Sequence, residues 1–194
     1  MARPREFDEN EVLDKAVKVF WELGYEATSI GDLVEHMGIN RASLYGAFGS
    51  KAQLFIAVLD RYADQVVSQL VYHLRKKPSA KASIHDFFKV LVEHGAKGGV
   101  LRGCLVTNSA VDGAMANPEI AAKVTTLLKS IENCFYAVLE RGLSAGEFDA
   151  GMDIQAQARY LTSSMQGMLV MSKVFPEAKV LQDVADHILN SLER

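Results

Sequence analysis

The chain has 194 residues, of which 49% are apolar and 23% charged, and a formal net charge of −3. This composition is that of a globular chain able to bury a sizeable core, and it lacks the basic excess that often marks nucleic-acid binders. No apolar run reaches the roughly 18 residues of a membrane span, and residues 1–11 are too polar and acidic for a secretory signal, so we expect a soluble, cytoplasmic protein without a membrane partner. The two cysteines lack a CxxC spacing, which argues against a disulfide framework or a zinc site.

Apolar residues recur at helical spacing almost throughout, and strand signals are nearly absent. The chain is therefore predicted to be all-α, with about nine helices, three of them short and near the N-terminus. The first three are expected at residues 9–23, 30–37 and 41–48. Their predicted N-caps are Asp8 (with Glu11 as an acidic capping box), Thr28 or Ser29, and Asn40, and their predicted stops are Gly24, Gly38 and Gly49.

A long fourth helix is predicted to open at the capping box Ser50-Lys51-Ala52-Gln53 and to fade over residues 75–81. Pro78 and the charges there interrupt the apolar stripe, which makes this stretch a candidate boundary. The later helices are predicted over residues 84–92, from Cys104 to Met115, from Pro118 beyond Leu139, from Asp153 as cap to about Phe175, and from Pro176 to Leu192.

Two short helices joined by a glycine-bearing turn are typical of a helix-turn-helix, which places its second helix in the major groove of DNA. With Leu44 pointing inward, Phe48 lies on the same side of helix 41–48, and Ala42 and Gly46 lie opposite. A groove about 12 Å wide admits a helix only if the side chains facing the bases are modest. The bareness of Ala42 and Gly46 therefore indicates close approach to DNA.

Polar residues around that bare strip are candidates for contacts with bases and phosphates. The N-terminus of the second helix favours an anion, as does that of the fourth. The predicted DNA-binding residues are Arg3, Arg5, Thr28, Ser29, Asn40, Arg41, Ala42, Ser43, Tyr45, Gly46 and Lys51. The alternatives are a packed core tyrosine at 45, a solvated surface arginine at 41 and a simple helix cap at 28–29.

The stretch TSIGDLVEHMGINRASLYGAFGSKAQLF at residues 28–55, preceded by FWELGYEA, resembles the DNA-binding domain of TetR-family transcriptional regulators of the AcrR-like kind, over about residues 7–60. The likeness implies a DNA-binding domain over residues 1–50 and a larger helical domain for ligand binding and dimerisation over residues 51–194. It also implies a homodimer that binds a palindromic operator through helix 41–48, by family default as a repressor. Gly46 departs from the family, where many members have a bulkier polar residue.

The C-terminal helices support a homodimer independently, because the helix over 154–175 is apolar on two sides and a monomer would expose a large apolar patch. The residues expected near the two-fold axis are Arg159, Tyr160, Ser163, Gly167, Val170, Met171, Val184 and Ile188.

The inducer is expected to be an unidentified small molecule in an apolar cavity. Candidate lining residues are Phe87, Phe88, Leu91, Cys104, Asn108, Met115, Leu128, Phe135, Met165 and Met168, with plain core as the alternative for each. RGCLVTNSAVDGA also resembles a subgroup with GC-L at the start of the sixth helix, in which some cysteines respond to oxidants or electrophiles. A thiol near a helix N-terminus, with Arg102 close in sequence, would be reactive. The alternative for Cys104 is a small buried hydrophobe.

Other function classes have less support in the sequence. The five histidines are scattered, with no i, i+4 pair for a metal, and no cofactor is implied. There is no glycine-rich phosphate loop, G-x-S-x-G or HExxH motif, so the chain is not expected to be an enzyme. The alternatives to a regulator are a helical protein-protein adaptor, or an enzyme with an undetected site.

Overall fold

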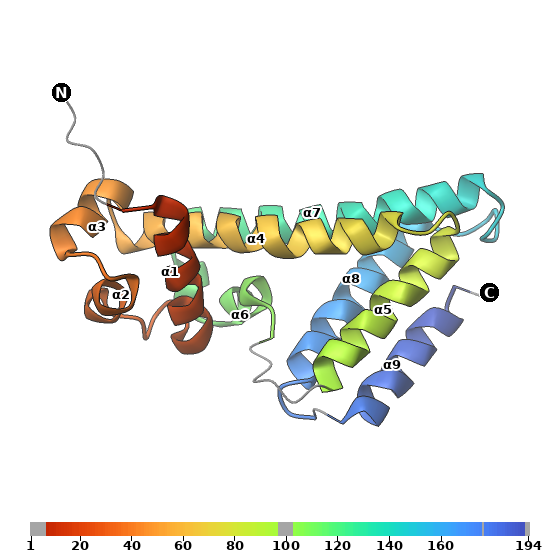
Figure 1. Cartoon of the computed structure of the whole chain (residues 1–194). Helices are drawn as coiled ribbons and strands as arrows, with labels where there is room; N and C mark the ends of the chain where they lie inside the picture. The colour runs from red at the N-terminus through yellow and green to blue at the C-terminus, as the bar shows by residue number, and fades with distance from the viewer. Residues whose placement is uncertain (1–6, 97–102, 176, 193–194) are drawn as a thin grey trace. The chain divides into compact units, whose positions relative to one another are not determined.

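The computed structural model describes residues 7–96, 103–175 and 177–192. Within these ranges all regular structure is helical, with nine α-helices and one 3-10 helix, η1 (Figure 1). The helices are α1 (Glu9–Leu23), α2 (Ile30–Met37), α3 (Arg41–Phe48), α4 (Lys51–Arg75), α5 (Ala80–Ala96), α6 (Leu105–Val111), η1 (Gly113–Ala116), α7 (Pro118–Ser144), α8 (Ile154–Met171) and α9 (Ala178–Asn190). The predicted all-α class is confirmed.

The first three helices begin and end at the residues that their caps predict. The side chains of Asp8, Ser29 and Asn40 each accept a hydrogen bond from a backbone N–H in the first turn. Gly24, Gly38 and Gly49 have positive φ and donate their N–H groups back to the last turn of each helix.

The chain divides into two compact units that are not contiguous in sequence. Unit 1 comprises Met1–Gln65 and Leu105–Leu127, and unit 2 comprises Val66–Cys104 and Leu128–Arg194. Unit 1 therefore contains more than the DNA-binding domain expected over residues 1–50, because α6, η1 and the start of α7 pack with it. The predicted division of the chain into a domain over residues 1–50 and a domain over residues 51–194 stays a prediction.

The first helix of unit 1 is held on α4 by aromatic packing and by one ion pair. The ring of Phe20 lies 4.7 Å from that of Phe55, and Tyr25 lies 4.9 Å from Phe55. The guanidinium of Arg61 on α4 donates to both carboxylate oxygens of Asp14 at 2.8 Å. This forked geometry fixes the orientation of α1 as well as its position.

The prediction of one helix from Cys104 to Met115 is wrong, because the structure breaks this stretch at Asp112 into α6 and η1. Asp112 is extended, and its Oδ1 accepts from the N–H of Ala114 at 2.8 Å to cap η1. Its Oδ2 accepts from the N–H of Tyr25 at 3.2 Å. A side chain that satisfies two backbone donors outside α6 competes with helix continuation, which explains the break.

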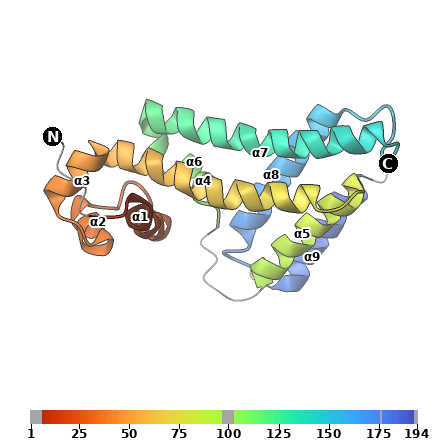
Figure 2. The same ribbon diagram turned by 45° about the horizontal axis from the view of Figure 1, so that its top comes forward.

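Unit 2 has its core around three phenylalanine rings. Phe87 contacts Phe88 and Phe135 edge-on, with ring centroids 5.3 and 5.5 Å apart. Around them α9 packs against α5 and α8, and Figures 1 and 2 show these three helices side by side. The eighth helix ends at Met171 and not near Phe175, and the last begins at Ala178. Pro176, where it was predicted to begin, lies outside the described residues.

No single helix in the described ranges has the length and apolar composition of a membrane span. Only Arg41–Phe48 together with Lys51–Gln65 meets those criteria, as a pair bent by 69°. Several apolar side chains of this pair, including Leu44 and Phe55, are buried in unit 1. The apolar composition of this helix pair is therefore explained by packing in the core of unit 1.

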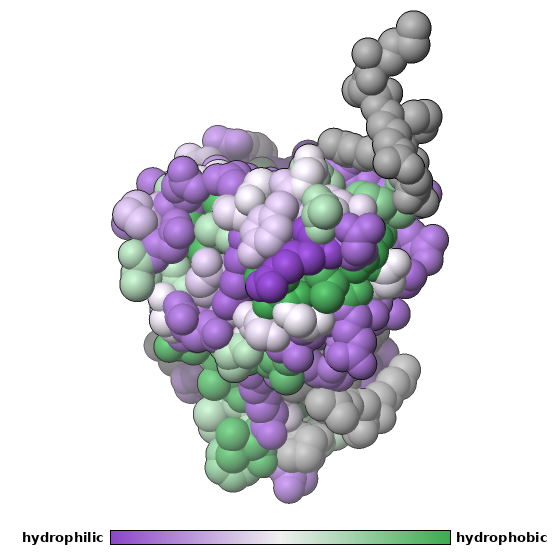
Figure 3. All heavy atoms as spheres, turned by 90° about the vertical axis from the view of Figure 1, so that its left-hand side faces the viewer, coloured by the Kyte–Doolittle hydropathy of each residue, from purple (hydrophilic) through white to green (hydrophobic). Residues whose placement is uncertain are grey.

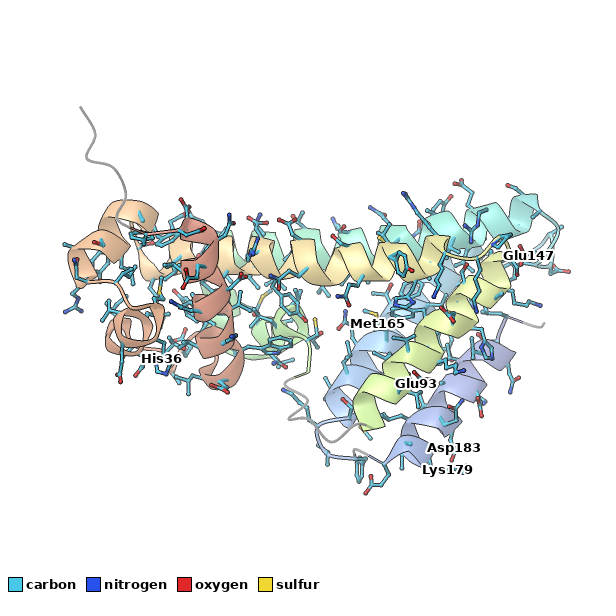
Figure 4. The ribbon with its side chains drawn as sticks, viewed as in Figure 1. His36, Glu93, Glu147, Met165, Lys179 and Asp183 are labelled. Carbon is cyan, nitrogen blue, oxygen red and sulfur yellow. The ribbon has the colours of Figure 1, made fainter. Side chains whose placement is uncertain are left out.

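Glu147 caps the start of α5 from the connection that follows α7 (Figure 4). Its Oε1 accepts from the N–H of Ala80 at 2.9 Å, and its Oε2 accepts from Ser79 Oγ at 2.6 Å and from the N–H of Lys81 at 3.0 Å. Burial acts to raise the pKa of Glu147, but these hydrogen bonds and the charge of Arg141 outweigh it and lower the pKa below the ordinary 4.5. The ionised carboxylate is therefore the form that stabilises unit 2.

Replacing Glu147 by glutamine should lower the free energy of unfolding at neutral pH, because the charge at the helix N-terminus is lost. A group whose pKa is lowered by folding stabilises the fold above its unfolded pKa, and this contribution disappears as the pH falls through the folded value. The difference between wild type and Glu147→Gln should thus be largest near neutral pH and shrink below the ordinary pKa of 4.5. Urea unfolding followed by circular dichroism across this range measures it.

Glu177→Gln is the matched control, because Glu177 occupies the N-cap position of α9 without a side-chain hydrogen bond there. A Glu147→Gln difference that is independent of pH would contradict the role of the ionised carboxylate.

Candidate nucleic-acid interface

The third helix is held in one rotational orientation by two side chains. Leu44 is fully buried and Phe48 is 9% exposed, so the predicted inward side of α3 is confirmed. Asn40 Oδ1 accepts from the N–H of Ser43 at 2.8 Å at the start of the helix. At its end, the N–H of Gly49 donates to the carbonyl of Tyr45 at 2.8 Å. The orientation of the side of α3 opposite Leu44 and Phe48 is therefore fixed as well.

That opposite side is exposed and nearly bare. Ala42 and Gly46 are exposed, and a Cβ added at Gly46 would meet no atom within 4 Å. Arg41 is exposed, Ser43 is half-buried and the side chain of Tyr45 is 42% exposed, which excludes a packed core tyrosine at this position. Figure 3 views the side of unit 1 on which α2 and α3 lie, and hydrophilic residues surround smaller apolar areas there.

The two residues at the start of α2 differ in exposure. Ser29 is exposed and forms a reciprocal capping box with Asp32, whose pKa is lowered by the hydrogen bonds from the Ser29 hydroxyl and backbone N–H. Thr28 is 1% exposed, and its hydroxyl donates to the carbonyl of Gly24 at 2.6 Å. The Thr28 side chain thus stabilises the turn after α1, and of the pair only Ser29 presents its side chain to solvent.

Lys51 lies across the connection between α1 and α2. Its Nζ is 4.5 Å from the centre of the Tyr25 ring and donates to the carbonyl of Glu26 at 3.4 Å. The ammonium is therefore positioned by an aromatic face and a carbonyl oxygen near the start of α4. Arg3 and Arg5, two further cations predicted to contact DNA, lie outside the described residues.

Sequence analysis missed Asp112 as a residue that positions this site. Its bond to Tyr25 joins residues 87 apart in the chain. A Cβ added at Gly113 would lie 2.6 Å from the Cγ of Glu26, so η1 approaches the same connection closely. The Asp-Gly pair was a turn signal that would have located the helix break, but no local pattern identifies Tyr25 as its partner.

The predicted ligand-lining residues fall into two sets. Phe87, Phe88, Leu91, Phe135, Met165 and Met168 belong to the packed core of unit 2. Cys104 is 4% exposed just before α6, Asn108 and Leu128 are half-buried, and Met115 on η1 is 37% exposed. Asn108 and Met115 belong to unit 1, and the other eight belong to unit 2.

Five of the eight residues predicted near a two-fold axis line a groove between α8 and α9, although one of them, Ile188, is only 2% exposed and belongs to the core of unit 2. A groove of about 560 Å³ runs between these helices, lined by Tyr160, Gly167, Met171, Val184 and Ile188 among others. Val170 beside it is 43% exposed and Ser163 is exposed. Arg159, also on this helix, pairs with Glu132 at 3.4 Å. The predicted apolar second side of α8 is confirmed.

The His, Cys, Asp and Glu side chains form no cluster that could bind a metal in the part of the chain that the structure describes. No group of three or more His, Cys, Asp or Glu residues there could hold a metal ion. Among the histidines, His36 on α2 (Figure 4) bonds through Nδ1 to the carbonyl of Asp32, and His73 faces Asp86.

Comparisons with known proteins agree with this architecture. Residues 12–58 match the family described as bacterial regulatory proteins, tetR family, and residues 80–188 match a tetracyclin repressor-like C-terminal domain. The uncharacterized HTH-type transcriptional regulator YezE of Bacillus subtilis (strain 168) is 35% identical over 194 residues, all of both chains. The HTH-type transcriptional repressor ComR of Escherichia coli (strain K12) is 30% identical over 94% of this chain and 88% of its own.

A solved structure adds DNA to the comparison. A cysteine mutant of the TetR family transcriptional regulator CifR, complexed with 26-bp double-strand operator DNA, superposes with a TM-score of 0.88 at 30% identity, covering 97% of this chain and 98% of that one. The C-terminal family match alone covers more than half of the 194 residues. The chain therefore belongs to the TetR family and is a DNA-binding transcriptional regulator, not an enzyme.

Proposed function

We propose that this protein is a cytoplasmic repressor that binds a palindromic operator as a homodimer through α3. The observation that supports this most is the outward side of α3, where Arg41, Ser43 and Tyr45 flank the bare strip of Ala42 and Gly46. Arg41 would pair with guanine or a phosphate, Ser43 with either kind of group, and the Tyr45 hydroxyl with the DNA backbone. Repression is inferred from the similarity to ComR, an HTH-type transcriptional repressor.

The homodimer is supported by the exposed apolar side chains of α8 and α9. Tyr160, Met171 and Val184 are each about 40% exposed around the groove. A contiguous apolar face of this kind is covered in stable proteins, and a two-fold axis through it would bury the same residues of both copies. The two α3 helices of such a dimer would match a palindrome whose half-sites lie about one turn of the DNA apart.

Release is proposed to follow from a small ligand or from modification of the Cys104 thiol. Cys104 directly precedes α6, whose next residue after the helix, Asp112, contacts the connection between α1 and α2. The bulk of an adduct on a side chain that is 4% exposed has no space without displacing its neighbours. Such a displacement of α6 would be passed through Asp112 to the connection between α1 and α2, and so to the DNA-binding helices.

Operator binding is tested with DNA from upstream of the protein's own gene. Wild type should bind with an affinity that falls steeply with salt, because contacts to phosphate release counterions. Tyr45→Ala should bind at least about tenfold more weakly, because one phosphate contact is lost in each subunit. Val184→Asp should be monomeric by analytical ultracentrifugation and lose specific binding. Fluorescence anisotropy with labelled duplex measures the affinities.

Tyr72→Ala is the matched control for Tyr45→Ala, because Tyr72 is a 59% exposed tyrosine in unit 2. Absence of both a specific complex and a salt dependence would contradict operator binding and favour a protein-protein adaptor. If the Val184→Asp variant remained dimeric, this would contradict a two-fold axis through the apolar face of α8 and α9.

Gly46→Ala should separate stability from DNA binding. The added methyl meets no atom within 4 Å, so the variant should be more stable by up to about 1 kcal/mol, the difference in helix propensity. The same methyl would stand between the backbone of α3 and the bases, so operator affinity should fall several-fold. Equal or tighter operator binding in the anisotropy assay would show that α3 does not approach the bases at this residue.

Thiol release is tested with an electrophile such as N-ethylmaleimide. Cys104→Ser should bind operator as wild type does but should not be released by the reagent. Cys134→Ser is the control and should be released normally, since it retains Cys104. Unchanged release of Cys104→Ser would exclude the thiol mechanism and leave a non-covalent ligand as the signal.

A further inference from the structure

A second, smaller pocket lies between the C-terminal end of α4 and the C-terminal part of α7, within unit 2. Figure 2 shows the two helices running alongside each other. The pocket has a volume of about 190 Å³. Apolar side chains from both helices form its walls: Val71, Leu74, Ala137 and Val138. The space holds a few water molecules or one small organic molecule.

Arg141 lines this pocket, and its guanidinium is held in a fixed orientation. Its Nη2 donates to the carbonyl of Leu74 at 3.1 Å and to Ser83 Oγ at 3.2 Å, which fixes the guanidinium in place. Its Nε is buried and has no hydrogen-bond partner among the described residues. The guanidinium therefore presents a fixed positive charge at the wall of the pocket, and a ligand of opposite charge is favoured there.

Arg75 adds a second positive charge. It is exposed at the last residue of α4 and lines the pocket with Cys134. Burial raises the pKa of the Cys134 thiol, and the charge of Arg75 acts in the opposite direction, which places guanidinium and thiol within electrostatic range. The thiol is therefore neutral near pH 7 and does not neutralise Arg75.

No acidic side chain is among the described residues that line the pocket, although the charge of Arg141 also acts on Glu147 outside it. None of the seven described residues that line it is Asp or Glu. The nearby Glu147 has both carboxylate oxygens bonded to the start of α5. Two guanidinium groups at a pocket without an anion are a complementary site for a carboxylate, which guanidinium binds in a forked geometry.

We propose that this pocket binds a small organic carboxylate, with its carboxylate on Arg75 and Arg141 and a short alkyl chain against Val71, Leu74, Ala137 and Val138. The four apolar side chains favour a hydrocarbon tail over a bare inorganic anion. The site is separate from α3 and from the groove between α8 and α9, so the proposal does not rest on operator binding or dimerisation.

The test is a thermal-shift and calorimetric titration of the full chain with straight-chain carboxylates from acetate to hexanoate, each beside its neutral amide, at constant ionic strength. At least one carboxylate should give a saturable rise in the unfolding midpoint, and its amide should give none. The dissociation constant should be about tenfold or more weaker for Arg75→Gln. Lys76→Gln, which removes the neighbouring exposed cation, is the matched control and should bind as wild type does.

Cys134 provides a local readout that does not depend on stability. The bound carboxylate should slow alkylation of Cys134 by iodoacetamide, as followed by peptide mass spectrometry, in proportion to occupancy. Saturable binding that leaves Cys134 alkylation unchanged would overturn the location of the site. Binding of phosphate or sulfate with equal affinity would overturn the carboxylate assignment, and no saturable shift with any carboxylate would overturn the proposal.

Discussion

The burial of Leu44 and Phe48 is the constraint on which the DNA-binding surface depends. A helix of eight residues is not stable alone in water, because too few hydrogen bonds repay its nucleation. The two apolar side chains attach α3 to the core of unit 1, and Asn40 and Gly49 close its ends. Since one side is anchored, the identity of the outward residues is decided by the helical period alone. The burial of Leu44 and Phe48 therefore turns Ala42 and Gly46 outward.

The connection between α1 and α2 is held from two directions by residues distant in sequence. Lys51 lies over the ring of Tyr25, and Asp112 accepts from its backbone N–H. The hydroxyl of Thr28 then closes the turn onto Gly24. Each of these contacts contributes only modestly by itself. Together they set where α2 begins, and with it the direction in which Ser29 and the helix dipole point.

Helix ends and inward sides were predictable from sequence because they depend on near neighbours. Asp8, Asn40 and Gly49 act within one helical turn, and Leu44 and Phe48 share a face by period. The burial of Thr28 was not predictable, because the acceptor for its hydroxyl is offered only when the turn has formed. The position of Lys51 on Tyr25 likewise requires the fold of unit 1. The break at Asp112 had a local signal, but its partner, 87 residues away, had none.

The discontinuity of unit 1 has a consequence for dissecting the protein. The residues that precede unit 2 in the chain are not a self-sufficient module, because the segment Leu105–Leu127 completes their core and supplies Asp112. A fragment that ends at Gln65 would leave the N–H of Tyr25 without its acceptor and would lose the ion pair of Asp60 with Lys123. A chimera that transplants the DNA specificity of this regulator onto another protein must therefore exchange two separate stretches of chain, because a single crossover after α4 would omit Leu105–Leu127.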